Sequence, residues 1–206
     1  MPQSRRYKKK KSAGKAILAW IIVLAILAAG VFVFVSVFYE DAKKKLDEMN
    51  YPRTYSTYVE KAAKDYDLDP ALIYAVIHTE SGFNPKAESG VGAKGVMQMM
   101  PSSFEWLQEQ RGCAGQYTED DLFDPEICID YGSYLLKYFY DYYGTERSAI
   151  AAYNAGFVVS DWLNDTNYSS DGKNLDSIPY PETKNYVDKV ESAKEMYIKL
   201  YYSQSN

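Results

Sequence analysis

Residues 16–38 contain no charged side chain, and this stretch, AILAWIIVLAILAAGVFVFVSVF, constrains the chain more than any other feature. Only Gly30 and Ser36 interrupt its apolar residues. As a helix it would measure roughly 35 Å, which exceeds the roughly 30 Å hydrocarbon core of a bilayer. The stretch therefore predicts a retained transmembrane anchor. A cleaved signal peptide is the alternative, but its apolar region runs to only about 15 residues.

The residues on either side of this stretch indicate its orientation. Residues 1–15 carry seven basic and no acidic side chains, and positively charged flanks remain in the cytoplasm. We therefore expect residues 1–15 to be a basic cytoplasmic tail, residues 39–50 a charged stem, and residues 51–206 an extracellular domain on the cell-wall side. The basic tail could instead bind nucleic acid, but an apolar span directly follows it, so we expect no nucleic-acid partner.

The charge of the expected extracellular domain limits the kind of ligand it can bind. From Tyr51 onward the sequence contains 13 basic and 24 acidic residues, which gives a net charge of −11 (13 − 24). Coulomb attraction does not favour an anionic polymer at such a surface. A ligand is therefore expected to be held by shape and hydrogen bonds.

Cysteine and histidine are scarce in the chain. Outside a membrane, Cys113 and Cys128 could form a disulfide, and closing a loop of about 15 residues would contribute roughly 3 kcal/mol. The alternative is two free, buried thiols. Two cysteines and a single histidine, His78, are too few for a zinc site of the usual kind. We therefore expect neither a metal nor another cofactor.

Helical periodicity runs through residues 51–206, and strand alternation is nearly absent. An aspartate followed by proline marks the starts of the second and fourth helices. We therefore expect one mainly α domain. Its predicted helices span residues 55–68, 69–80, 101–110, 124–144, 146–156 and 181–202.

Glu80 is the most informative acidic residue. Leu72, Val76 and Glu80 share one helical face at four-residue spacing, and that face is expected to be buried. Glu80 also lies at the C-terminal end of the helix, where unpaired carbonyls disfavour a negative charge. Both effects raise the pKa of a carboxyl group, as a general acid for glycosidic cleavage requires. The alternative is an ordinary glutamate paired with a lysine such as Lys86. His78, two residues away, turns to another face.

The segment after this helix, GVGAKGVMQMMP, is rich in glycine and can approach a ligand closely. A long loop of this composition inside a compact domain is often functional. Gln98 is a polar residue among apolar neighbours, and its amide could hydrogen-bond a sugar. A core glutamine with its hydrogen bonds satisfied is the alternative interpretation.

Four segments of the chain, in order, resemble the lytic transglycosylases of the soluble Slt type. These segments are ESGFNPKAESGVGAKGVMQMMP, DPEICIDYGSYLL, AIAAYNAG and IPYPETKNYVDKV. The resemblance covers nearly all of residues 51–202. It implies a lysozyme-like fold, as in goose-type lysozymes, and peptidoglycan glycan strands as the substrate.

The resemblance also implies a reaction and a set of site residues. The β-1,4 bond between N-acetylmuramic acid and N-acetylglucosamine would be cleaved with Glu80 as the single catalytic acid and base, which leaves a 1,6-anhydromuramoyl product. The substrate supplies its own nucleophile, so the second carboxylate of ordinary glycosidases is not needed. The family's other site residues correspond to six positions of this chain. Three of them would line the sugar subsites: Ser89, Gln98 and Met100. The other three would face Glu80 across the cleft: Tyr153, Asn154 and Tyr186.

Two positions depart from the family pattern. The family usually has Asn where this chain has Cys128, which suggests that a bridge to Cys113 has taken over a structural role. After YNAG the family commonly has a further Gly, whereas this chain reads FVVSDW from Phe157. The loop beside the cleft is therefore expected to differ in shape.

Two other functions remain open at this point. A hydrolytic muramidase would use the same fold and place water at the reacting carbon. A non-catalytic glycan-binding subunit of an envelope-spanning assembly would keep the fold without the chemistry. The presence of Glu80 favours an enzyme over the non-catalytic subunit.

Overall fold

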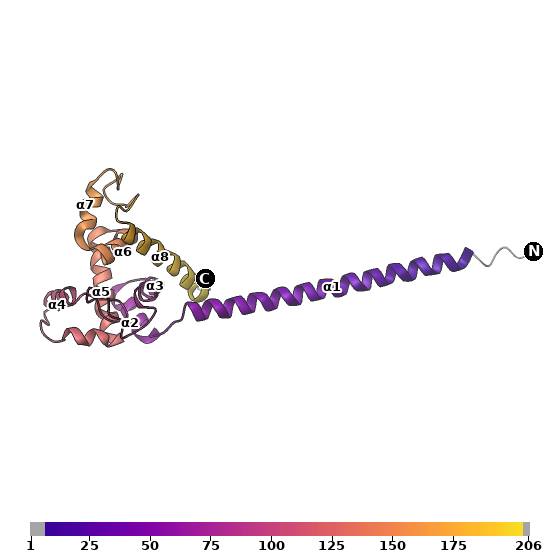
Figure 1. The fold of residues 1–206 in the computed structure, drawn as a ribbon, viewed down its shortest axis with the longest axis horizontal. Helices are drawn as coiled ribbons and strands as arrows, with labels where there is room; N and C mark the ends of the chain where they lie inside the picture. Colours follow the sequence, from indigo (N-terminus) through magenta and orange to yellow (C-terminus); the bar gives the residue numbers. More distant parts are fainter. Residues whose placement is uncertain (1–6, 204–206) are drawn as a thin grey trace, which may run out of the picture. The chain divides into compact units, whose positions relative to one another are not determined.

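The computed structural model describes residues 7–203 of the chain, with side chains from residue 14 onward. The chain divides into two compact units, Met1–Asn50 and Tyr51–Asn206, which are described separately (Figure 1). Residues 1–6 of the expected cytoplasmic tail lie outside the described residues.

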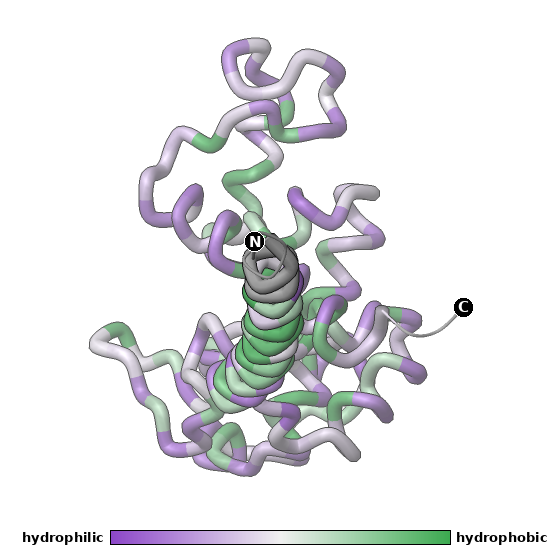
Figure 2. The backbone as a smooth tube through the Cα atoms, turned by 90° about the vertical axis from the view of Figure 1, so that its right-hand side faces the viewer, coloured by the Kyte–Doolittle hydropathy of each residue, from purple (hydrophilic) through white to green (hydrophobic). Residues whose placement is uncertain are grey.

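The first unit is one helix, α1 (Tyr7–Asn50), of 44 residues. Hydrophobic residues predominate along much of it (Figure 2), and its part Gly14–Asn50 is long and apolar enough to cross a membrane. The helix continues through the charged stem, where Lys45 and Asp41 form an ion pair at 3.0 Å with the four-residue spacing that stabilises helices. By length and composition α1 is a candidate membrane anchor.

The second unit is mainly α, as predicted, and residues 51–203 contain isolated β-bridges but no strand. All six predicted helices are present, and their bounds are α2 (Ser56–Tyr66), α3 (Pro70–Ser81), α4 (Pro101–Gln110), α5 (Pro125–Tyr143), α6 (Glu146–Ala155) and α8 (Pro181–Tyr197). Three short elements were not predicted because they are too short to show periodicity: η1 (Glu119–Phe123), η2 (Gly156–Val158) and α7 (Val159–Asn164). The last predicted helix, 181–202, instead consists of α8 followed by a π-helical turn, η3 (Ile198–Tyr202).

The central helix is α3, which packs against α2 and α8 (Figure 1). Its ends confirm the sequence signals: the Asp69 side chain accepts a hydrogen bond from the Ala71 amide at 2.9 Å, and Gly82 ends the helix with φ +58°. The burial pattern differs from the expectation of one buried face. Every residue from Ala71 to Ile77 is buried, because other elements surround the helix. Polar residues appear only in its last turn, where Glu80 lies.

The segment after α3 folds back onto α5 at very short range. A Cβ atom added to Gly95 would lie 2.0 Å from the Leu122 carbonyl oxygen, and one added to Gly132 of α5 would lie 2.5 Å from the Met97 sulfur. These two positions therefore tolerate only glycine at the present spacing. Their lack of a side chain allows residues 93–99 to lie directly against η1 and α5.

The structure contradicts the predicted disulfide between Cys113 and Cys128. Both thiols are free. The buried Cys128 sulfur accepts a hydrogen bond from the Met97 amide at 3.4 Å and donates one to the Lys94 carbonyl, whereas Cys113 contacts the Tyr131 hydroxyl at 3.3 Å. The free thiol of Cys128 thus forms hydrogen bonds with backbone groups of residues 94–97, and a disulfide is not needed to hold this segment.

We predict that Gly95→Ala destabilises the second unit by roughly 3 kcal/mol or more. The change adds overpacking, which typically costs about 1–3 kcal/mol, to the strain of a side chain at φ +77°. Gly92→Ala is the matched control, because Gly92 also has a positive φ, +86°, but open space around it. Gly92→Ala is expected to lower the free energy of unfolding by only about 1 kcal/mol. Thermal melts followed by near-UV circular dichroism measure both, and equal losses would contradict the steric argument.

Candidate active site

Glu80 lies in the last turn of α3, directly after the fully buried part of that helix. Burial raises the pKa of its carboxyl group from 4.5 to about 7, and an interaction with Tyr186 lowers it in part. The direction of this shift agrees with the sequence argument. A carboxyl group with this pKa can hold a proton near neutral pH and can also give it up, which suits both an acid and a base.

Two tyrosines from separate helices face Glu80. Tyr153 lies in α6 and Tyr186 in α8, and burial together with the charge of Glu80 raises the pKa of both phenols well above 10. The Tyr186 hydroxyl interacts with Glu80, although it forms no regular hydrogen bond with any of the described residues. A buried, unpaired hydroxyl beside an acid is a group that a substrate oxygen can satisfy.

Tyr153 connects α6 to the glycine-rich segment. Its hydroxyl donates a hydrogen bond to the Met97 carbonyl at 2.9 Å and contacts the Met99 sulfur at 3.4 Å. Because the proton of this hydroxyl is already engaged, Tyr153 presents its ring and an oxygen lone pair to the site. Met97 and Met99 are both buried, so they belong to the core against which Tyr153 packs.

The side-chain amide of Gln98 is partly satisfied by the protein and partly open to a ligand, so it fits both interpretations given above: a core glutamine and a sugar-binding residue. Its amide nitrogen donates to the carbonyls of Ala87, at 3.0 Å, and Gly95, at 2.9 Å, and these bonds hold the loop closed. Its backbone adopts φ 48°, an uncommon value for a residue with a side chain. The amide oxygen accepts no hydrogen bond from the described residues and remains an acceptor for a ligand.

The other loop residues predicted to line sugars lie at the two ends of this segment. The Ser89 hydroxyl accepts a hydrogen bond from the Ala93 amide at 2.9 Å, which closes the turn between them. Met100 directly precedes α4, and its side chain is exposed. Ser89 therefore shapes the loop, whereas Met100 offers an apolar surface to solvent.

Asn154 is exposed at the end of α6, and sequence reasoning missed the residue that positions it. The hydroxyl of the buried Thr183, in the first turn of α8, donates to the Asn154 amide oxygen at 2.8 Å. This bond joins the same two helices that carry Tyr153 and Tyr186. The only sequence signal for Thr183 was its place in the segment PETKNYV.

His78 does not take part in this arrangement. Its ring stacks on Tyr51 with centroids 4.8 Å apart, and it is not among the groups that shift the pKa of Glu80. Among the described residues, no three His, Cys, Asp or Glu side chains form a group that could hold a metal ion.

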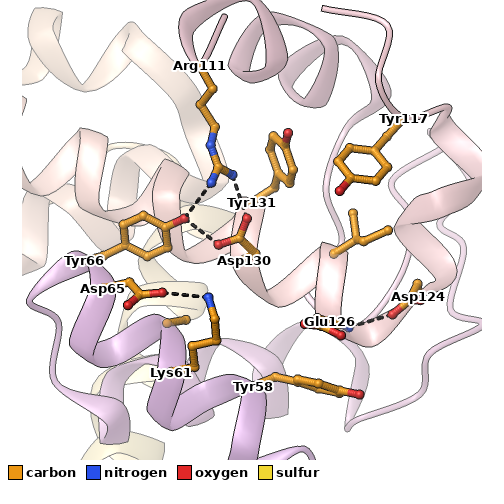
Figure 3. A pocket seen from close by; sticks show the side chains of 12 residues that line it. Tyr58, Lys61, Asp65, Tyr66, Arg111, Tyr117, Asp124, Glu126, Asp130 and Tyr131 are labelled. Carbon is orange, nitrogen blue, oxygen red and sulfur yellow. Dashed lines mark hydrogen bonds and ion pairs between the residues drawn. The ribbon is translucent and has the colours of Figure 1, made fainter. Parts of the chain in front are cut away.

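A cavity of about 610 Å³ lies elsewhere, between α2 and the start of α5 (Figure 3). On one wall Arg111 pairs with Asp130 at 2.7 Å and donates to the Tyr66 hydroxyl at 3.2 Å. None of the residues that line it is among the groups coupled to Glu80. This cavity is thus lined by residues other than Glu80, Tyr153 and Tyr186.

We predict that Glu80→Gln stabilises the protein in a pH-dependent way. The folded pKa of about 7 exceeds the unfolded value of 4.5, so the folded state binds more protons between these values and loses stability as pH rises through them. A glutamine cannot ionise. The variant should therefore match the unmodified protein near pH 4.5 and be more stable by up to about 3 kcal/mol at pH 8.

Thermal melts at pH 4.5, 6 and 8 measure this difference, with Glu182→Gln, an exposed glutamate in the first turn of α8, as the control. A difference between Glu80→Gln and the unmodified protein that is the same at all three pH values would refute the assigned environment.

Known proteins share both sequence and fold with this chain. The soluble lytic murein transglycosylase of Escherichia coli (strain K12) is 33% identical over 146 residues, which cover 69% of this chain and 23% of that protein. The membrane-bound lytic murein transglycosylase C of Actinobacillus succinogenes is 31% identical over 167 residues, which cover 70% of this chain and 47% of that protein. The chain thus spans less than half the length of these relatives.

A solved structure shares the fold. The crystal structure of lytic transglycosylase Slt from Pseudomonas aeruginosa, an inactive mutant in which one glutamate is replaced by glutamine, superposes with a TM-score of 0.65. The two sequences are 30% identical, and the match covers 74% of this chain and 25% of that one. Residues 57–175 match the family described as the transglycosylase SLT domain, and the chain belongs to that family.

Proposed function

We propose that this protein is a lytic transglycosylase that cleaves the β-1,4 bond between N-acetylmuramic acid and N-acetylglucosamine in peptidoglycan. The observation that carries the proposal is Glu80, a carboxyl group whose burial raises its pKa to about 7. Membership of the SLT domain family supports the reaction class. The inactive glutamate-to-glutamine mutant of the Pseudomonas aeruginosa relative supports a dependence on one glutamate.

The proposed mechanism uses Glu80 twice. The protonated carboxyl group gives its proton to the glycosidic oxygen as the bond to C1 of the muramic acid breaks. The resulting carboxylate then accepts the proton of the muramoyl 6-hydroxyl while that oxygen bonds to C1. The product is a 1,6-anhydromuramoyl end, no water is consumed, and Glu80 returns to its protonated form.

The surroundings of Glu80 suit a single-carboxylate mechanism. Apart from burial, the group named as shifting the pKa of Glu80 is the phenol of Tyr186, which is not a carboxylate. Ordinary glycosidases place a second carboxylate about 5–10 Å away to attack the sugar or activate water. An intramolecular hydroxyl removes the need for that group.

The polar groups left unpaired around Glu80 are proposed to bind the sugars. The buried Tyr186 hydroxyl would donate to a substrate oxygen, and the Gln98 amide oxygen would accept from an acetamido N–H or a hydroxyl. Asn154, with its oxygen held by Thr183, presents its NH₂ group. Ser89 and Met100 would complete the loop wall of the cleft.

We also propose that α1 anchors the enzyme, with residues 1–15 in the cytoplasm and residues 51–206 on the cell-wall side. The apolar helix and the name of the membrane-bound Actinobacillus succinogenes relative support an anchor. The seven basic residues before the span support the orientation.

Product analysis tests the chemistry. Peptidoglycan digested by the unmodified protein should release muropeptides that end in 1,6-anhydromuramic acid, which mass spectrometry detects as a loss of one water relative to muramidase products. Glu80→Gln should lower the rate at least about 10²–10⁴-fold, because it removes the transferable proton. The Glu182→Gln variant serves as the active control.

Each alternative outcome assigns a different function. Reducing ends in place of anhydro ends would mean that water attacks C1 and that the protein is a muramidase. Binding of glycan strands without any cleavage would identify a non-catalytic subunit. A folded Glu80→Gln variant with full activity would exclude Glu80 from the mechanism.

Protease accessibility tests the topology. Protease added to intact cells without their wall should digest residues 51–206 and leave a membrane-bound fragment. An epitope fused before residue 1 should stay protected until the membrane is permeabilised. Protection of the domain and digestion of the epitope would reverse the orientation.

A further inference from the structure

Four aromatic side chains form a contiguous surface on the second unit, which we call the aromatic platform: Trp106 of α4, Tyr138 and Tyr142 of α5, and Phe157 of η2. Ring centroids lie 5.0 Å apart for Trp106 and Tyr138, and 6.3 Å apart for Tyr138 and Tyr142. Tyr142 and Phe157 follow at 5.8 Å. The rings thus form one continuous set of contacts across three elements.

The outer rings of the platform are open to solvent. Tyr142 is 58% exposed and Phe157 is 50% exposed, although Phe139, with which Phe157 is in contact at 5.4 Å, is buried. Burial of a large aromatic ring stabilises the folded protein, so several neighbouring rings that remain exposed are an unusual feature of a folded surface. Exposed apolar patches of this kind mark binding surfaces.

Two of the three elements that carry the platform begin next to residues of the proposed active site. Helix α4 starts directly after Met100, so Trp106 lies about 9 Å farther along the helix axis. On the other side, Phe157 is three residues beyond Asn154 and follows Gly156, where α6 ends. Trp106 and Phe157 are therefore each close along the chain to a side chain proposed to contact the sugars, Met100 and Asn154.

We propose that the aromatic platform is a carbohydrate-binding surface that holds the glycan strand beyond the residues around Glu80. This inference rests on the proposed function, because the bound strand is the one that is cleaved. The apolar C–H faces of pyranose rings pack against aromatic rings, and the two tyrosine hydroxyls can hydrogen-bond sugar hydroxyls. The four rings carry no charge, so they would bind the sugar rings by stacking and hydrogen bonds rather than by Coulomb attraction.

Phe157 supplies one outer edge of the platform. A residue without a ring at this position would leave Tyr142 without the edge contact of Phe157. The platform therefore acts on specificity: it favours long glycan strands over short fragments and leaves the chemistry at Glu80 unchanged.

Tryptophan fluorescence gives a direct readout of the platform. The chain has three tryptophans: Trp20 in α1, Trp162, which is 4% exposed and packs on Tyr180, and Trp106 in the platform. Titration of the full-length Glu80→Gln protein in detergent with the β-1,4-linked hexamer of N-acetylglucosamine should shift the emission. The shift should disappear in the same protein with Trp106→Phe.

Truncation of the outer rings should weaken this binding. Phe157→Ala and Tyr142→Ala are each expected to raise the Kd of the hexamer by about tenfold, as loss of a contacting aromatic ring does at other interfaces. Tyr142→Phe keeps the ring and should bind within about threefold of the unmodified protein. Tyr140→Ala is the matched control, because Tyr140 is an exposed tyrosine of α5 outside the platform and should leave the Kd unchanged.

The same variants in the active protein separate this inference from the proposed function. With isolated glycan strands, Phe157→Ala should raise KM and leave kcat unchanged. If cleavage is absent altogether, the proposed function fails, and the fluorescence titration still decides the platform. If cleavage occurs but Trp106 emission does not respond, or both alanine variants bind the hexamer normally, the platform is not a carbohydrate surface and another partner covers it.

Discussion

The arrangement around Glu80 depends on the contact of residues 93–99 with α5. Gly95 and Gly132 lack the atoms that would separate the two, and the Cys128 thiol satisfies the Met97 amide between them. The Met97 carbonyl then receives the hydroxyl of Tyr153. The position of Tyr153, which faces Glu80, thus depends on close backbone contacts between residues 93–99 and α5.

Burial of Glu80 favours its protonated form, although the proposed reaction also needs its ionised form. The surroundings that raise its pKa to about 7 do so by making the ionised form unfavourable. The carboxylate is nevertheless the form required for the second half of the proposed reaction. Tyr186 moderates this conflict, since its phenol stabilises the charge in part. The site therefore holds the carboxyl group where both protonation states are accessible near neutral pH.

Sequence reasoning succeeded where the determining interactions are local. The bounds of α3 follow from Asp69, Pro70 and Gly82, whose effects act within one turn of helix. The upward shift of the Glu80 pKa was also predicted, although the helix proved to be buried on all sides rather than on one face. Propensity and periodicity carry enough information for features of this kind.

Features that depend on distant contacts could not be predicted in the same way. The disulfide was wrong because two cysteines at a suitable spacing say nothing about where each sulfur points, and Cys128 points toward the Lys94 carbonyl. The role of Thr183 depends on α8 lying against α6. The aromatic platform joins rings from three elements, so no single segment of the sequence contains its pattern.

The buried thiol of Cys128 also bears on the environments in which the folded domain can persist. Burial raises its pKa to about 12, so the sulfur stays in the unreactive thiol form at neutral pH. A sulfur in this state exchanges poorly with glutathione or with other disulfides. Since both cysteines are free, the native fold contains no bond that a reductant can break. A reducing compartment therefore removes no covalent bond from the folded domain.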